Sequence, residues 1–123
     1  NTSNTTNNGD VNSTCTYSGG FVGHIAQNEN LTIVISNHIN NGNVTVDSFT
    51  GKFAGVFLNN DNVNVTISDS VFNGNVDGSN CGGIIGYLKE NKNITVTISN
   101  TIINGNLTGS TYVEGLLGGL ENN

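Results

Sequence analysis

Gly19-Gly20-Phe21-Val22-Gly23 is the first of four blocks that recur along this chain; the others are Gly51-Lys52-Phe53-Ala54-Gly55, Gly82-Gly83-Ile84-Ile85-Gly86 and Glu114-Gly115-Leu116-Leu117-Gly118. Equivalent positions in successive blocks are 32, 31 and 32 residues apart. A fixed period of this size is typical of solenoids, in which each repeat stacks on its neighbours. The blocks therefore predict rungs that begin near residues 19, 51, 82 and 114, preceded by a partial rung over residues 1–18.

Runs of alternating residues follow the first three blocks, at residues 31–36, 63–68 and 94–99. Period-two alternation of β-branched residues predicts half-buried strands, with the aliphatic residues inward and Thr or Asn outward. An Asn-Gly pair then marks a turn at residues 41–44, 73–76 and 104–107, because both residue types tolerate positive φ. No segment has helical periodicity. We predict one all-β domain over residues 1–123, a parallel β-solenoid (β-helix) of about four rungs of 31–32 residues.

Each predicted rung holds two or three short strands, and equivalent positions stack about 4.8 Å apart. Aliphatic columns then fill the interior, while asparagine columns can form side-chain amide ladders at the corners. In the glycine blocks both faces are apolar, since Val22, Ala54, Ile85 and Leu117 alternate with the residues expected inside. Either another element, such as a neighbouring subunit, covers this second face, or these residues are ordinary isolated surface aliphatics.

The composition narrows the class of protein. The chain carries a formal net charge of −6, with three lysines and no arginine. Nucleic-acid binding requires neutralisation of phosphates, so it is not expected. A basic membrane-surface helix and a membrane-spanning segment are not expected either, because no basic amphipathic stretch or long apolar run is present. Residue 1 is Asn, so we interpret the chain as a processed product or a segment of a longer protein.

Asn-x-Ser/Thr sequons are dense, and they begin at Asn1, Asn4, Asn12, Asn30, Asn43, Asn64, Asn93 and Asn106. Some sequons arise by chance in a chain so rich in asparagine and threonine. The alternation of the strands nevertheless places five of them on outward faces, where a glycan must lie, namely Asn30, Asn43, Asn64, Asn93 and Asn106. We therefore predict dense N-glycosylation in a secretory pathway of eukaryotic type, with chance composition as the alternative.

The sequons are also staggered from rung to rung. Asn30 and Asn93 occupy equivalent positions two rungs apart, and the sequon of the intervening rung is displaced to Asn64. Asn43 and Asn106 are likewise equivalent and two rungs apart. Two glycans one rung apart would crowd each other, so this spacing favours occupied sites.

Two cysteines, Cys15 and Cys81, fit an oxidising compartment. They lie about two rungs apart, roughly 10 Å along the stack, which exceeds the Cα separation of a disulfide unless loops close the gap. Three arrangements remain open: a disulfide within the chain, a disulfide between two subunits, and two buried free thiols.

Signals for catalysis and metal binding are weak. His24 and His38 replace residues that differ in the other rungs, which indicates variable surface positions. The aspartates are scattered, and no calcium-binding repeat, zinc spacing, nucleophile elbow or phosphate loop is present. The Gly-Gly pairs recur in every region without a following helix, so close packing or a bend explains them better than phosphate binding. We expect no enzyme activity, no catalytic or metal-binding residues and no cofactor.

The glycine blocks resemble the GLUG motif, a short repeat of surface and secreted microbial proteins that include some peptidases and adhesin-like chains. Gly115-Leu116-Leu117-Gly118 matches the motif directly, and Gly83-Ile84-Ile85-Gly86 and Gly20-Phe21-Val22-Gly23 match it closely, whereas Lys52-Phe53-Ala54-Gly55 departs at the first glycine. The resemblance covers about a sixth of the chain. It implies an extracellular β-solenoid and transfers no enzymatic residues.

These observations favour a structural role: an extracellular β-solenoid that forms or decorates a glycan-coated filament or cell-surface stalk. Both ends of the chain read as unfinished repeats, so the expected partners are copies of the chain stacked head to tail, besides covalent N-glycans. The alternative function is an adhesin-type repeat module that binds glycans or surfaces. Tyr17, Tyr87 and Tyr112 lie at or near glycine blocks and form a conceivable sugar-stacking strip, although packing explains them more simply.

Overall fold

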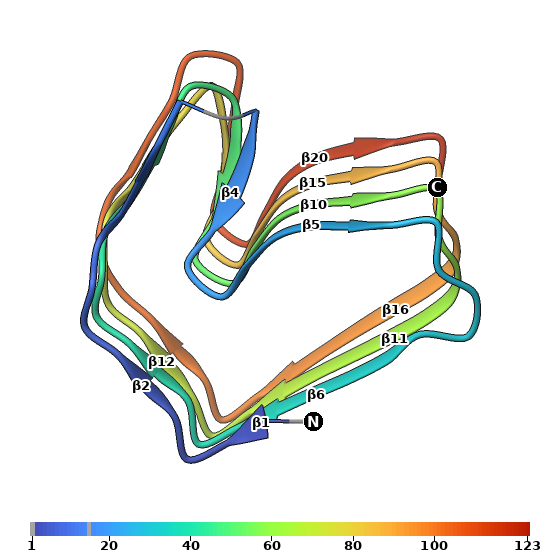
Figure 1. The fold of residues 1–123 in the computed structure, drawn as a ribbon, viewed down its shortest axis with the longest axis horizontal. Coiled ribbons are helices and arrows are strands. Elements are labelled where there is room, and N and C mark those ends of the chain that lie inside the picture. Colours follow the sequence, from blue (N-terminus) through green and yellow to red (C-terminus); the bar gives the residue numbers. More distant parts are fainter. Residues whose placement is uncertain (1, 15) are drawn as a thin grey trace.

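The computed structural model of the chain describes residues 2–14 and 16–123. These residues form a parallel β-solenoid and contain no helix, which confirms the predicted fold class. Seen down the stack, the turns lie over one another and enclose an outline with one deep indentation (Figure 1). The first turn holds β1 to β5, the second β6 to β10, the third β11 to β15 and the fourth β16 to β20.

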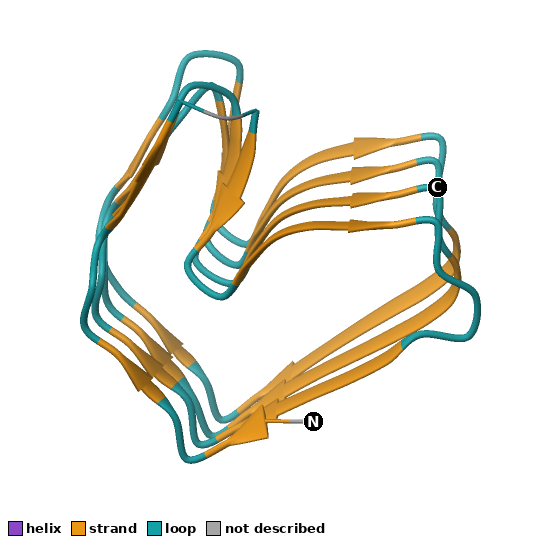
Figure 2. Cartoon of the chain, in the orientation of Figure 1, coloured by secondary structure: helices purple, strands orange, loops and turns teal. Residues whose placement is uncertain are grey.

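The strands of the described residues belong to five parallel sheets, each with one strand from every turn (Figure 2). The long-strand sheet contains β1 (Thr2–Ser3), β6 (Thr32–Ser36), β11 (Asp61–Ser68) and β16 (Lys92–Ser99). Two sheets of shorter strands follow: β2 (Thr6–Asn7), β7 (Ile39–Asn40), β12 (Val71–Phe72) and β17 (Ile102–Ile103), then β3 (Val11–Ser13), β8 (Val44–Val46), β13 (Val76–Asp77) and β18 (Leu107–Thr108).

The last two sheets border the indentation, and we call them the groove sheets. The first contains β4 (Tyr17–Gly19), β9 (Phe49–Gly51), β14 (Asn80–Gly82) and β19 (Tyr112–Glu114). The second contains β5 (Val22–Ala26), β10 (Ala54–Leu58), β15 (Ile85–Lys89) and β20 (Leu117–Glu121). Each described turn thus has five strands, more than the two or three predicted, because strands of two or three residues are too short to show alternation.

The register of the sheets follows the repeat found in the sequence. Val65 of β11 pairs with Ile33 on one side and with Val96 on the other. The same strand buries Val63, Val65 and Ile67, each no more than 1% exposed. The equivalent aliphatic residues of β6 and β16 pack against the same core. The predicted inward face of the long strands is therefore confirmed.

In the two middle turns the chain itself buries both faces of the glycine blocks. Ala54 and Ile85 are fully buried and belong to the same core cluster as Phe53 and Ile84. The chain turns back on itself at each block, as the inner end of the indentation shows (Figure 1). No neighbouring subunit is needed to cover Ala54 and Ile85, and they are not surface aliphatics.

Glycine permits the close approach of the two groove sheets at this bend. A Cβ atom added to Gly86 would lie 2.5 Å from the carbonyl oxygen and 2.6 Å from the amide nitrogen of Thr50. Both atoms belong to the backbone, so the clash has no side chain that can move aside. The prediction that the glycines serve a bend and close packing is confirmed.

The Asn-Gly turns form for a different reason from the one the sequence suggested. Among the described glycines only Gly105 has a positive φ, of 88°. At Gly74, an added Cβ would instead lie 1.9 Å from the carbonyl oxygen of Gly42 in the turn below. The glycine therefore allows turns to stack closely, rather than supplying a left-handed backbone.

The left-handed residues form three columns at other corners. Eleven non-glycine residues have φ between 45° and 57°, and they are Asn4, Asn37, Asp69 and Asn100 in one column, Gln27, Asn59, Glu90 and Asn122 in the second, and Asn30, Asn62 and Asn93 in the third. Asn and Asp enter this region at lower cost than most residues, because their short polar side chains can hydrogen-bond locally. The fold therefore accounts for part of the asparagine content.

Candidate functional site

The sequon asparagines that the structure describes are all exposed: Asn4, Asn12, Asn30, Asn43, Asn64, Asn93 and Asn106. Asn1 lies outside the described residues. Exposure is the condition that glycan transfer requires, but it does not establish that a glycan is present. Modification at these positions therefore remains a prediction.

Two of the sequon columns are hydrogen-bonded ladders that use the asparagine side chain differently. In the first, Asn93 Nδ2 donates to Asn62 Oδ1 at 3.1 Å, and Asn62 Nδ2 donates to Asn30 Oδ1 at 3.2 Å. In the second, side-chain oxygens accept from backbone N–H groups, and the ladder joins Asp10, Asn43, Asn75 and Asn106 at 2.8–2.9 Å. The second column leaves the Nδ2 atoms, to which glycans attach, out of the ladder.

The fold requires asparagine at some sequons but not at all of them. Position 30 combines a left-handed backbone with a ladder, so asparagine there has a structural reason. Asn64 pairs with Thr32 and Thr95 in the middle of β11 and faces outward. Asn12 likewise pairs with Thr45. Since threonine serves at these equivalent positions, neither a corner nor a ladder explains asparagine at 64 or 12.

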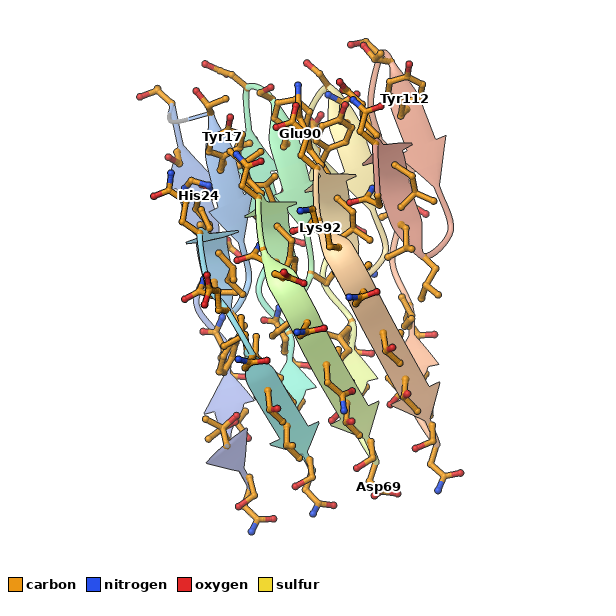
Figure 3. The ribbon with its side chains drawn as sticks, turned by 90° about the vertical axis from the view of Figure 1, so that its right-hand side faces the viewer. Tyr17, His24, Asp69, Glu90, Lys92 and Tyr112 are labelled. Atoms are coloured by element: carbon orange, nitrogen blue, oxygen red, sulfur yellow. The ribbon has the colours of Figure 1, made fainter. Side chains whose placement is uncertain are left out.

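An aromatic groove runs along the indentation between the two groove sheets. We define it by its lining residues, which are Tyr17, Phe49, Val56, Leu58, Asn59, Tyr87, Lys89, Glu90 and Glu121. Tyr17 and Tyr112 lie at the first and last turns on the same edge of the molecule, with Glu90 between them, while Asp69 lies at the opposite edge (Figure 3).

The rings in the groove stack from one turn to the next. The Tyr17 ring lies 4.9 Å from His24 and 5.5 Å from Phe49, measured between centroids, and the Phe49 ring lies 4.7 Å from Tyr87. Interplanar angles of 30–34° give each pair a tilted, offset arrangement, which is favoured over a face-to-face sandwich. Stacked aromatic rings therefore line the groove.

The rings alternate between the two walls after the first turn. Phe49 comes from β9, Tyr87 from β15 on the opposite wall, and Tyr112 from β19. In the fourth turn Gly119 replaces a bulky residue: a Cβ there would lie 2.5 Å from Tyr87 Cδ2 and 3.7 Å from Tyr112 Cδ2. The absence of a side chain at Gly119 thus makes room for the Tyr87 ring.

Charged groups lie at the rim of the groove beside these rings. Tyr87 Oη donates a hydrogen bond to Glu121 Oε2, and Lys89 Nζ lies 3.2 Å from Glu121 Oε1. The hydrogen bond to Glu121 raises the pKa of Tyr87 to about 12, and burial adds to the shift. The same bond, together with Lys89, lowers the pKa of Glu121. The rim therefore holds a carboxylate, an ammonium group and a phenol in fixed positions.

The structure also contains a buried asparagine ladder. Asn28 Nδ2 donates to Asn60 Oδ1 at 3.0 Å, Asn60 Nδ2 donates to Asn91 Oδ1 at 2.8 Å, and Asn91 Nδ2 donates to Asn123 Oδ1 at 2.9 Å. Asn60 and Asn91 are 2% and 1% exposed. The predicted amide ladders are thus confirmed, and this one lies inside the stack.

The two histidines have different environments. His24 is exposed, as predicted, whereas His38 is 2% exposed and the prediction of a surface position is wrong. Its ring packs 5.5 Å from Phe21 and 5.6 Å from Phe72, and its Nδ1 is hydrogen-bonded to Thr5 Oγ1. Its Nε2 is buried without a partner among the described residues, and burial lowers its pKa.

Sequence reasoning missed a buried lysine. Lys52 is 1% exposed, its Nζ has no hydrogen-bond partner among the described residues, and burial lowers its pKa. The sequence did contain a sign of this unusual position, because Lys52 stands where the first and third blocks have Gly20 and Gly83.

Cys81 is a free, buried thiol in the structure, and Cys15 lies outside the described residues. Cys81 Sγ donates to the carbonyl oxygens of Gly78 and Thr108, at 3.1 and 3.0 Å. Burial raises the pKa of the Cys81 thiol to about 11. The predicted disulfide stays a prediction, and a bridge between subunits would require Cys81 to become accessible.

Within residues 2–14 and 16–123, no group of three or more His, Cys, Asp and Glu side chains is placed to hold a metal ion. The same residues contain no helix long and apolar enough to cross a bilayer. Comparison with protein-family models, with curated proteins and with solved structures finds no match to this chain. The resemblance to the GLUG motif therefore remains a prediction from the glycine blocks.

Proposed function

We propose that this chain is a structural subunit or segment of an extracellular, glycan-coated filament or cell-surface stalk. The observation that carries the proposal is the stacking itself, since every sheet repeats the same register from turn to turn. Such a stack forms an extended, rigid element and can be prolonged by any further turn of the same register.

Within each asparagine ladder the hydrogen bonds point the same way along the stack, which determines how a further copy could be added. On the outer surface Asn41, Asn73 and Asn104 each donate Nδ2 to the Oδ1 of the turn before, at 2.8, 2.7 and 2.9 Å. Within the described residues, Asn8 Nδ2 at the first turn and Asn104 Oδ1 at the last have no ladder partner. The two atoms are complementary, so a copy stacked head to tail continues the ladder.

The apolar residues at the two faces of the stack support the same arrangement. Phe21 in the first turn is 40% exposed, and Leu116 and Leu120 in the last are 42% and 66% exposed. These residues belong to columns that are buried in the middle turns, where Phe53 and Ile84 are fully buried. Another turn, from a second copy or from a longer chain, would bury them in the same way.

The distribution of sequons supports a glycan coat. The described sequon asparagines are exposed, and none of them lies on a groove sheet. At Asn64 the fold itself gives no reason for asparagine. Intact-mass measurement of the native protein before and after glycosidase treatment tests the coat, and an unchanged mass would contradict it.

Electron microscopy of the purified chain tests the assembly. Head-to-tail stacking predicts filaments with an axial repeat of about 19 Å for a four-turn copy, from a strand spacing of about 4.8 Å. Discrete monodisperse particles at high protein concentration would contradict the filament. The extracellular location is part of the same proposal and rests on the sequons and the cysteines.

A further inference from the structure

The aromatic groove has the composition of a binding site. Binding sites are concave and largely apolar, with a few polar groups that fix the ligand. Here Tyr17, Phe49 and Tyr87 supply rings, while Lys89 and Glu121 supply a donor and an acceptor beside them. We propose that the aromatic groove binds a linear, uncharged saccharide chain laid along the axis of the stack.

The repeat of the groove matches a polymer rather than a compact ligand. Every turn contributes one ring in or beside the groove: Phe49 packs against Tyr17 below it and Tyr87 above it, and Tyr112 follows in the last turn. Tyr17 and Tyr112 lie on the same edge of the molecule (Figure 3). Tyr112 is 53% exposed. A linear saccharide presents a C–H face and hydroxyl groups at each unit, so it can meet an aromatic contact at each turn. Aromatic faces carry negative charge density that attracts such C–H groups.

The rim distinguishes a saccharide from a proline-rich peptide, which also docks in aromatic grooves. Glu121 accepts from Tyr87 and pairs with Lys89, but a carboxylate has about four acceptor sites, so sites remain for further donors. Sugar hydroxyls both donate and accept, and therefore suit Glu121 and Lys89 together. Proline lacks an N–H group and has nothing to donate to Glu121.

The groove also offers no open strand edge to an extended peptide. In the second and third turns each groove strand has a neighbour on both sides, namely β9, β10, β14 and β15. Their backbone groups are therefore used within the sheets, and β-augmentation has no site along the groove. Recognition must come from side chains, which favours rings and hydroxyl-binding groups.

The sequons leave this part of the surface uncovered. They begin on or beside the long-strand sheet and the sheets of shorter strands, and the described ones avoid both groove sheets. This one step of the reasoning rests on the proposed glycan coat. A coated protein that keeps one groove bare leaves it accessible to a large ligand.

Isothermal titration calorimetry tests the site with cellohexaose, chitohexaose and mannohexaose as probes, on the whole chain before and after removal of N-glycans. We expect saturable binding of at least one probe, weakened about tenfold by Tyr17→Ala, since Tyr17 lines the groove, and several-fold by Glu121→Gln. Ile102→Ala is the matched control, because Ile102 is 55% exposed and lies outside the groove. Circular dichroism confirms that each variant is folded.

Two outcomes would overturn the inference: no binding of any probe, or binding that Tyr17→Ala and Glu121→Gln leave unchanged. The result is separable from the proposed structural role. If the chain binds the probes but carries no glycans and forms no filaments, the groove site is supported and the structural proposal is contradicted. If the chain is glycosylated and forms filaments but binds no probe, the structural proposal is supported and the groove site is contradicted.

Discussion

Asn60 and Asn62 are two residues apart at the same corner, yet they belong to different kinds of ladder. Asn60 is 2% exposed, and its side chain bonds to Asn28, Asn91 and the carbonyl oxygen of Ile25. Asn62 is exposed, has a φ of 53° and bonds only along its ladder. An identical residue therefore acts as a core hydrogen-bonding group in one column and as a corner residue in the other.

The difference lies in what replaces a lost hydrogen bond. At the surface, water takes the place of the missing partner, so the net loss is small. Inside the stack the orphaned groups remain dry, and each costs about 1–3 kcal/mol. Buried ladders should therefore contribute more to the stability of the fold than exposed ladders do.

Breaking the buried ladder should have the largest effect. Asn60→Ala leaves the backbone N–H of Asn28 without its acceptor. It also removes one of the two hydrogen bonds that Asn28 Nδ2 donates and one of the two that Asn91 Oδ1 accepts. We expect the free energy of unfolding to fall by about 3 kcal/mol, measured by urea denaturation. Asn104→Ala, which shortens an exposed ladder, is the control and should cost less than 1 kcal/mol. Equal losses in the two variants would contradict the comparison.

Lys52 extends the comparison to a buried polar group that has no partner. Lys52→Met keeps the length of the side chain and removes the buried amine. Because Lys52 Nζ gains no hydrogen bond that offsets its burial, we expect the variant to be more stable by about 2 kcal/mol. Lys92→Met changes an exposed lysine and should shift stability by less than about 0.5 kcal/mol. A destabilised Lys52→Met would show that the amine has a role in the core.

The protonation of His38 offers a further test of how the burial of a polar group affects stability. Burial lowers its pKa in the folded chain below the usual 6.5, so the unfolded chain takes up the proton first as the pH falls. The free energy of unfolding should therefore decrease from about pH 7.5 downwards, until the folded pKa is passed. Denaturation midpoints between about pH 7.5 and pH 5.5 measure the slope, and His38→Gln should flatten it. An unchanged slope in the variant would assign the pH dependence to other groups.

The repeat in the sequence was enough to predict which positions stack, since Val65, Ile33 and Val96 pair as the period requires. The shape of each turn was not predictable from it, because a period specifies neighbours along the stack and not contacts across it. The groove depends on such contacts, between Phe49 of one sheet and Tyr87 of another. The burial of His38 and Lys52 was not predicted for the same reason. Each differs in residue type from the equivalent positions in the other turns, and the repeat does not show which residues pack against it across the turn.

The smallest effect is expected where the exposed ladder meets a left-handed corner. Asn62→Gly removes two ladder bonds that water can replace, but glycine adopts a φ of 53° without the steric cost that asparagine bears. These contributions oppose each other, so we expect a change within about 0.5 kcal/mol by urea denaturation. A loss approaching that of Asn60→Ala would mean that the exposed ladder stabilises the stack after all. A neutral result would leave the exposed asparagines of this column available for modification, as the proposed glycan coat requires of Asn30 and Asn93.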